Sequence, residues 1–264
     1  MKTLAFFGCG RLSTIVAKAI TDNILTGYTV IGTQSLYKED ADRLAAMMNT
    51  FTGTDQCKSC STIDELIALK PDYIVEAASP DALQSMALKA LSNGVSIVTL
   101  SIGGLADETF YEEVAKTAQE NNAKVHIASG AIGGFDVLRT ASLMGPSTVT
   151  FETEKGPNSL RYTPVYDDAL QTEERLVFTG NAKEAIAMFP HQVNVSVAAS
   201  LASIGPANTK VSVTSKPGYI GDKHCITLKN EQIHAVVDIY SSTPQIAGWS
   251  VVNTLRNIVS PIVF

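Results

Sequence analysis

Two glycines near the start of the chain have the spacing found in dinucleotide-binding turns. Gly8 and Gly10 follow the apolar segment KTLAFF and precede RLSTIVAKAITDNI, whose apolar residues recur with helical spacing. A G-x-G turn between a strand and a helix holds a pyrophosphate at the helix N-terminus. The third small position is Ser13, which still permits close packing of helix on strand. We therefore predict a dinucleotide site with contacts from Gly8, Gly10, Arg11 and Leu12.

The end of the second predicted strand bears on which dinucleotide binds. An Asp or Glu there would take the ribose hydroxyls of NAD, but the segment VIGTQSLYK has no acid at residues 33–35. An acid would repel the 2′-phosphate of NADP, so its absence, with Ser35 and Lys38 nearby, permits NADP. Because no arginine clamp accompanies them, the sequence predicts NADP or NAD. The alternative is a tight turn that binds no nucleotide.

A second glycine-rich stretch, SGAIGGFD at residues 129–136, follows the short apolar run AKVHIA. Glycine permits positive φ and the close approach of another group to the backbone. The stretch is therefore either a compact turn or a place where a ligand lies against the main chain.

Histidine is the side chain best suited to move protons near neutral pH, and the chain has four. His126 lies in an apolar strand and His234 in an alternating one, which favours structural roles for both. His191, at an expected helix break near Asn194, and His224, in a strand, rank nearly equal on residue type alone.

The elements that must position these residues fall into two predicted domains. Residues 1–128 alternate apolar strands with helices, which is typical of a Rossmann-type parallel sheet. Residues 129–240 contain short alternating strands and one long helical segment broken at Pro190, which predicts an α+β substrate domain with an antiparallel or mixed sheet. Residues 241–264 predict a helix that returns to the first domain.

Composition narrows the class of protein. The net charge of −6 argues against a nucleic-acid or anionic-membrane surface, and no apolar run approaches the roughly 20 residues of a membrane span. We expect a cytoplasmic protein. Cys57 and Cys60 form a C-x-x-C in an apparently polar loop, but no second pair or histidine stands at zinc-ligand spacing, so we expect no metal.

Several stretches together resemble the L-aspartate dehydrogenase family over nearly the whole chain. They are DYIVEAAS, SIGGLAD, SGAIGGFD, TEKGPNSL, FTGNAKEA, FPHQVNVSVAASLASIG and KPGYIGDKHCI, in order and at the family's spacing. The resemblance implies NAD(P)-dependent, reversible oxidative deamination of L-aspartate to oxaloacetate and ammonia through iminoaspartate. It also implies a homodimer and a supply of iminoaspartate for NAD biosynthesis.

The resemblance also implies roles for individual residues. The family's catalytic histidine falls on His224, its nucleotide-contacting alanine on Ala131 and its contacting asparagine on Asn194. The glycine-rich turn would then lie beside the nicotinamide. A basic residue before proline falls on Lys155, our first choice for binding a substrate carboxylate. The complete prediction is, for the cofactor, Gly8, Gly10, Arg11, Leu12, Ser35, Ala78, Ala131 and Asn194, and for the substrate, Lys155, Gly130 and His191.

Some positions depart from the family pattern. The region SSTPQIAGWS lacks the lysine of the usual Asn-Pro-Lys-Thr-Ser motif, and Gln192 and Asp222 each stand where the family has asparagine. Two alternatives therefore stay open: a dehydrogenase of another small amino or oxo acid, and a non-catalytic relative that binds NADP(H).

Overall fold

The computed structural model describes residues 1–264 and divides them into two compact units. The first unit contains residues 1–128 and 247–264, and the second contains residues 129–246. The C-terminal segment joins the first unit from Ala247, later than the predicted start at residue 241, and the second unit keeps the end of β11 at Ser241 and the five residues after it.

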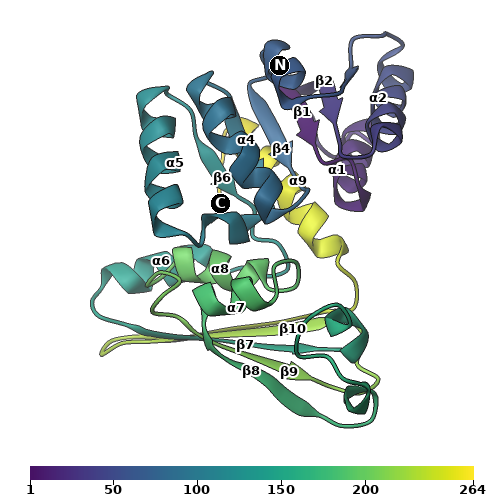
Figure 1. The fold of residues 1–264 in the computed structure, drawn as a ribbon. Coiled ribbons are helices and arrows are strands. Elements are labelled where there is room, and N and C mark those ends of the chain that lie inside the picture. The colour runs from purple at the N-terminus through teal and green to yellow at the C-terminus, as the bar shows by residue number, and fades with distance from the viewer. The chain divides into compact units, whose positions relative to one another are not determined.

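The first unit contains a parallel six-stranded sheet with the order β3-β2-β1-β4-β5-β6 (Figure 1). This is the strand order of the Rossmann fold, so the predicted fold class is confirmed. Its elements are β1 (Lys2–Phe7), α1 (Arg11–Thr21), β2 (Tyr28–Gln34), α2 (Lys38–Thr52), β3 (Lys58–Cys60), α3 (Ile63–Ala68), β4 (Tyr73–Glu76), α4 (Pro80–Ser92), β5 (Ser96–Thr99), η1 (Ile102–Leu105), α5 (Glu108–Glu120), β6 (Val125–Ile127) and α9 (Gln245–Val259).

Short polar residues start several of these helices. The side chains of Thr62, Ser79 and Asp107 accept hydrogen bonds from backbone N–H groups in the first turns of α3, α4 and α5. Pro80 fills the first position of α4, where the absent N–H is not needed. The last three residues of the CKSC segment, which was expected in a polar loop, instead form the edge strand β3.

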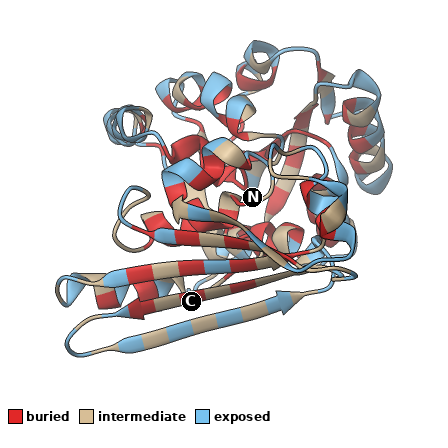
Figure 2. Ribbon diagram, turned by 60° about the horizontal axis from the view of Figure 1, so that its bottom comes forward, coloured by how far each residue is buried: buried red, intermediate tan, exposed pale blue.

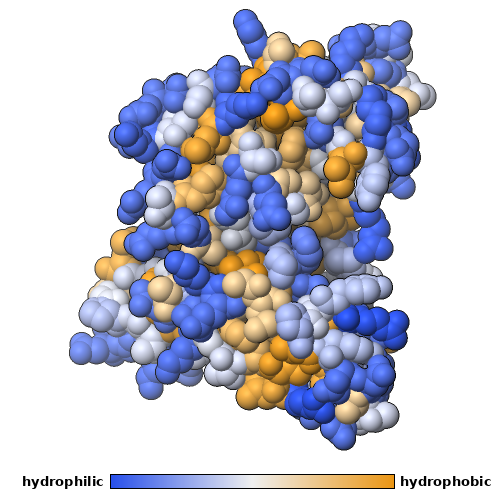
Figure 3. Space-filling view, in the orientation of Figure 1, coloured by the Kyte–Doolittle hydropathy of each residue, from blue (hydrophilic) through white to orange (hydrophobic).

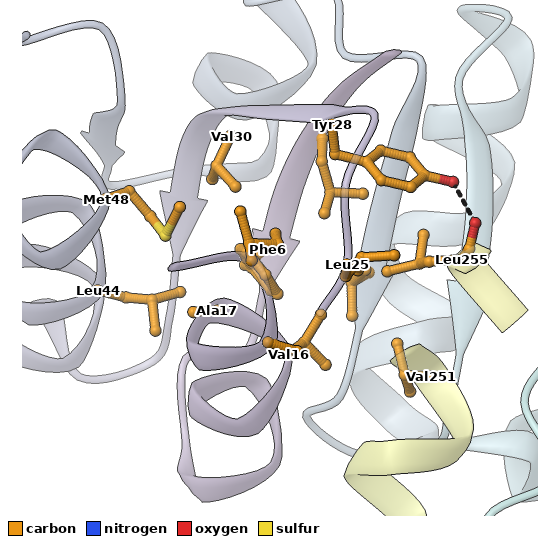
Figure 4. Packing of buried hydrophobic residues seen from close by; sticks show 14 of the residues in the cluster. Phe6, Val16, Ala17, Leu25, Tyr28, Val30, Leu44, Met48, Val251 and Leu255 are labelled. Atoms are coloured by element: carbon orange, nitrogen blue, oxygen red, sulfur yellow. Dashed lines mark hydrogen bonds between the residues drawn. The ribbon is translucent and has the colours of Figure 1, made fainter. Parts of the chain in front are cut away.

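Helix α9 completes the hydrophobic core of the first unit. Val251 and Leu255 of α9 are fully buried in the same cluster as Leu25 and Tyr28. The Tyr28 hydroxyl donates a hydrogen bond of 2.7 Å to the Leu255 carbonyl (Figure 4). The end of the chain is therefore part of the nucleotide-domain core, as its apolar pattern predicted.

The second unit contains a five-stranded mixed sheet with the order β11-β10-β7-β9-β8, with helices α6, α7 and α8 on one side of it (Figure 1). Only the β7–β9 pair is parallel. The elements are α6 (Phe135–Leu143), β7 (Thr148–Lys155), η2 (Pro157–Leu160), η3 (Asp168–Gln171), β8 (Arg175–Asn181), α7 (Ala182–Met188), α8 (Asn194–Leu201), β9 (Lys210–Ser215), β10 (Asp222–Lys229) and β11 (His234–Ser241).

The broken helix was predicted correctly, since α7 ends at Met188 and α8 begins at Asn194, with Pro190 between them. The strands of the sheet alternate buried and accessible residues (Figure 2). Because successive side chains point to opposite faces, Phe151, Thr153 and Lys155 of β7 share the buried face.

Hydrophilic side chains cover most of the face drawn in Figure 3, with smaller hydrophobic areas among them. No helix combines the length and the apolar character that a membrane crossing requires.

Candidate functional site

The turn after β1 closes tightly on the segment that follows β4. Gly8 has φ of +88°, and a Cβ added to it would lie 2.8 Å from the Ala78 Cβ and 2.9 Å from the Ala77 carbonyl carbon and oxygen. Neither the backbone conformation nor the space suits another residue. Ala78, a predicted cofactor contact, is therefore adjacent to the glycine turn and exposed.

The N-terminus of α1 has the features of an anion site. Gly10 is the N-cap residue and provides no side-chain cap, so the first-turn N–H groups keep their donor capacity. A Cβ added to Gly10 would meet no atom within 4 Å. Ser13 is buried and donates a hydrogen bond to the Gly8 carbonyl, which ties the turn to the helix. Arg11 is exposed and Leu12 half-buried beside this turn. A diphosphate fits this arrangement.

We expect Gly10→Ala to weaken NAD(P)H binding at least about tenfold while the melting temperature stays nearly unchanged. The added methyl group meets no protein atom, so it would clash only with a ligand that lies against the turn. Gly53→Ala, at the end of α2, is the control for affinity. Its surroundings are equally open, but its φ of +67° is strained for alanine, so this variant should lose some stability and no NAD(P)H affinity. Titration of both variants with NADH and NADPH, followed by protein fluorescence, measures the effect. Equal affinity in Gly10→Ala and the wild type would show that the pyrophosphate does not bind at this turn.

Cationic groups surround the end of β2 without forming a free clamp. Ser35 accepts a long hydrogen bond, 3.4 Å, from the Cys9 N–H, and Lys38 is paired with Asp42 and donates to the Ser59 hydroxyl. Arg43, which sequence reasoning missed, donates to the Cys9 carbonyl at 2.8 Å and to Asp40 at 3.0 Å. Its guanidinium therefore lies beside the glycine turn. Its only signal in the sequence is a lone arginine in the helix after the second strand.

Glu76, at the end of β4, is a second residue that sequence reasoning missed. It is fully buried and accepts hydrogen bonds from the Ala78 N–H at 2.8 Å, the Thr99 hydroxyl at 2.5 Å and the Ser101 hydroxyl at 2.8 Å. Burial raises the pKa of Glu76. The carboxyl group fixes the segment after β4, against which Gly8 packs, and so supports the conformation of the glycine turn. An acid inside the apolar run DYIVEAAS was the available signal.

In the second unit, strand register gathers polar residues into two adjacent rows on the buried face. Lys155 of β7 is paired with Ser215 of β9 on one side and Asp222 of β10 on the other. Two residues back along β7, Thr153 is paired with His224 of β10. Directly paired side chains on one face lie about 4.5–5.5 Å apart at Cβ. We call these five residues the polar cluster.

Lys155 is buried, with 3% of its side chain exposed, and its Nζ donates to Asp222 at 2.7 Å. Burial lowers the pKa of Lys155, and the nearby Asp222 carboxylate opposes that shift. Asp222 begins β10 and keeps 34% of its side chain accessible. The ammonium is therefore fixed inside the sheet, while its counter-ion lies at the edge of the buried region.

His224 is 2% exposed, and its ring lies 5.6 Å from that of Phe151. Burial, with a smaller contribution from Lys155, lowers the pKa of His224 to about 4. The imidazole is thus neutral at physiological pH and can accept a proton. Its Nδ1 has no hydrogen-bond partner, and neither do the buried hydroxyls of Thr153 and Ser215. The remaining buried side-chain atom without a partner is Nε2 of His126.

The glycine-rich turn and the start of α8 are close together. Gly130 has φ of +64°, and an added Cβ would lie 3.0 Å from Cγ1 of Val195, the residue after Asn194. Ala131 is half-buried in the same turn. The structure therefore brings the predicted residues Gly130, Ala131 and Asn194 into one region of the second unit.

The other histidines lie in different surroundings. His191 is exposed in the turn between α7 and α8, and His234 is exposed on β11. The ring of His126 lies 5.9 Å from that of Tyr73, in the first unit. His224 alone among the four belongs to the polar cluster. Cys57 and Cys60 are buried free thiols, and burial raises the pKa of Cys57 to about 12, so its thiol stays protonated.

Comparison with known proteins covers both units. The family model "Aspartate dehydrogenase, C-terminal" matches residues 136–258, and "Homoserine dehydrogenase, NAD binding domain" matches residues 8–128. The L-aspartate dehydrogenase of Methanococcus maripaludis is 32% identical over 99% of this chain and 98% of its own length, and that of Methanosarcina acetivorans is 33% identical with the same coverage. The crystal structure of aspartate dehydrogenase from Thermotoga maritima shares the fold, with a TM-score of 0.77 and 24% identity over 100% of this chain and 99% of that one. Because relatives above 30% identity cover 99% of its length, the chain belongs to the L-aspartate dehydrogenase family.

Proposed function

We propose that the protein is an NAD(P)-dependent L-aspartate dehydrogenase, which converts L-aspartate and water reversibly to oxaloacetate and ammonia. The observation that carries this proposal is the polar cluster, in which a neutral imidazole and a buried ammonium group lie on paired strands. The imidazole can transfer protons and the ammonium group can bind a carboxylate. The reaction of this substrate requires both functions.

The cofactor residues are proposed in two groups. Gly8, Gly10, Arg11 and Leu12 would hold the diphosphate at the N-terminus of α1, with Ala78 against the turn and Ser35 toward the adenosine ribose. Ala131 and Asn194 would contact the nicotinamide half. A bound oxidised dinucleotide would supply the hydride acceptor for C2 of aspartate, and the oxidised substrate would carry a C2–N double bond.

The chain's own residues would handle the remaining steps. Neutral His224 takes a proton from the water that adds to C2 and then passes it to the amino nitrogen. The C2–N bond breaks to release ammonia as the new hydroxyl loses its proton and becomes the carbonyl of oxaloacetate. In the reverse direction, the protonated imidazole returns that proton to the departing oxygen. Lys155 binds a carboxylate and fixes the substrate relative to His224. Gly130 leaves room for the substrate, and His191 contacts the substrate from the turn between α7 and α8. Burial keeps His224 in the neutral form that a base requires, and a bound dianion would raise its pKa toward the working pH.

The direct test supplies the purified protein with oxaloacetate, ammonium and either NADH or NADPH. We expect loss of the near-ultraviolet absorbance of the reduced nicotinamide, at a rate that depends on both substrates. Omission of ammonium should stop the reaction, which separates reductive amination from simple reduction of the keto group. Absence of turnover with either cofactor would refute the proposal.

We also propose that the protein acts in the cytoplasm as a homodimer and supplies iminoaspartate for NAD biosynthesis. The four free cysteines suit a reducing compartment. The accessible face of the second sheet carries Leu176, Val236 and Tyr240, each more than half exposed, which a second copy could cover. Light scattering during size-exclusion chromatography distinguishes a dimer from a monomer.

A further inference from the structure

The buried ammonium of Lys155 is occupied by a carboxylate of the chain itself. The two partners differ in accessibility: Lys155 is almost completely enclosed, whereas a third of the Asp222 side chain is accessible. Asp222 is also the first residue of β10 and follows the turn at Gly221, which has φ of +81°. The short Asp222 side chain, at the end of its strand, can rotate toward water without disturbing the sheet. The enclosed Lys155 side chain cannot rotate out in the same way.

The neighbours of Lys155 are incomplete in a way that points to a ligand. Ser215 is paired with Lys155 on the side opposite Asp222, and its hydroxyl is wholly buried without a partner. Thr153, two residues back on the same face, has an equally unpartnered hydroxyl with 1% exposure. Buried polar groups are normally satisfied, so each exception calls for an explanation. Together an ammonium and two hydroxyls form a donor set for the two oxygens of one carboxylate.

The Asp222 carboxylate and a ligand carboxylate compete for the positive charge of Lys155. With Asp222 in place, Lys155 is neutralised and His224 is uncharged, so an approaching anion meets no net positive charge. With Asp222 turned away, the same carboxylate meets an unpaired ammonium in surroundings that screen it poorly. A ligand carboxylate gains this interaction, and an uncharged amide of the same shape does not.

We propose that Lys155, Ser215 and Thr153 form the subsite for the second carboxylate of the substrate, and that Asp222 is an internal counter-ion which this carboxylate displaces. The subsite rests on the proposed function for its substrate, but its chemistry requires only a dicarboxylate. Asp222 thereby sets specificity, because its carboxylate balances the charge of the Lys155 ammonium until a competing carboxylate arrives.

The test compares Asp222→Asn with the wild type in two assays. Calorimetric titration with succinate, a dicarboxylate that cannot react, should show affinity about tenfold higher in Asp222→Asn, with no change for succinamide, its uncharged diamide. In turnover, the KM for L-aspartate should fall by a similar factor while the affinity for NADPH is unchanged. Asp238→Asn is the matched control, since Asp238 pairs with Lys223 at 3.3 Å on the opposite face of the same sheet. It should alter neither value.

Ser215→Ala provides a second variant, which does not depend on breaking an ion pair. Removal of a buried hydroxyl without a partner should leave the melting temperature unchanged or raise it, yet succinate should bind more weakly. Succinate affinity that is equal or lower in Asp222→Asn, or unchanged in Ser215→Ala, would overturn the subsite. Succinate binding needs no turnover, so failure of the subsite is distinct from failure of the proposed function. Failure of the proposed function would appear as a wild type that binds dicarboxylates but does not oxidise aspartate.

Discussion

Replacement of His224 by glutamine is expected to reduce turnover by about 10²- to 10⁴-fold, the usual contribution of a positioned acid–base group. Glutamine keeps a polar side chain of similar size beside Phe151 and Thr153 but cannot exchange a proton near neutral pH. The affinity for NADPH should remain within about twofold, since the cofactor residues of the first unit are unaltered. Steady-state kinetics in both directions, together with fluorescence titration of the cofactor, measures the two quantities.

Two other histidine variants control for this result. His234→Gln alters an exposed residue at the far end of β11 in the same sheet, and it should behave as the wild type. His191→Gln tests the other candidate that residue types alone left open. If His191→Gln lost turnover and His224→Gln kept it, the proton-transfer role would move to the turn between α7 and α8.

The local parts of this architecture could be predicted because they depend on neighbouring residues. The alternation of strand and helix specified the parallel sheet, and Gly8 and Gly10 marked its first turn. Pro190 marked the break between α7 and α8. Each of these features is encoded within one short segment.

The polar cluster could not be predicted in the same way, because it depends on register between distant strands. Lys155 and Asp222 are 67 residues apart in sequence, and they meet only because β10 runs antiparallel to β7 in one register. A shift by one residue would turn His224 to the opposite face. The parallel pairing of β7 with β9, which places Ser215 beside Lys155, has no local signal either. Glu76 is similar, since its partners Thr99 and Ser101 lie at and just after the end of the next strand, β5.

Acidification should destabilise the wild type more than His224→Gln. In the folded protein the pKa of His224 is about 4, against 6.5 for an unperturbed imidazole. Between these values the unfolded chain binds more protons than the folded one, so the free energy of unfolding falls as pH falls. The contribution is complete above about pH 6.5 and is lost progressively toward pH 4, with a total of roughly 3 kcal/mol.

Denaturant unfolding of both proteins at intervals from pH 7 to pH 4 isolates this contribution. Carboxyl groups that titrate in the same range, such as Glu76, whose pKa is raised by burial, are present in both proteins and cancel in the difference. Lys155 and Asp222, whose charges act on the imidazole, are also retained in the variant. The stability difference, wild type minus His224→Gln, should therefore decrease as pH falls and level off near pH 4. A difference independent of pH would mean that the imidazole is hydrated and titrates normally, and the neutral buried base would no longer be tenable.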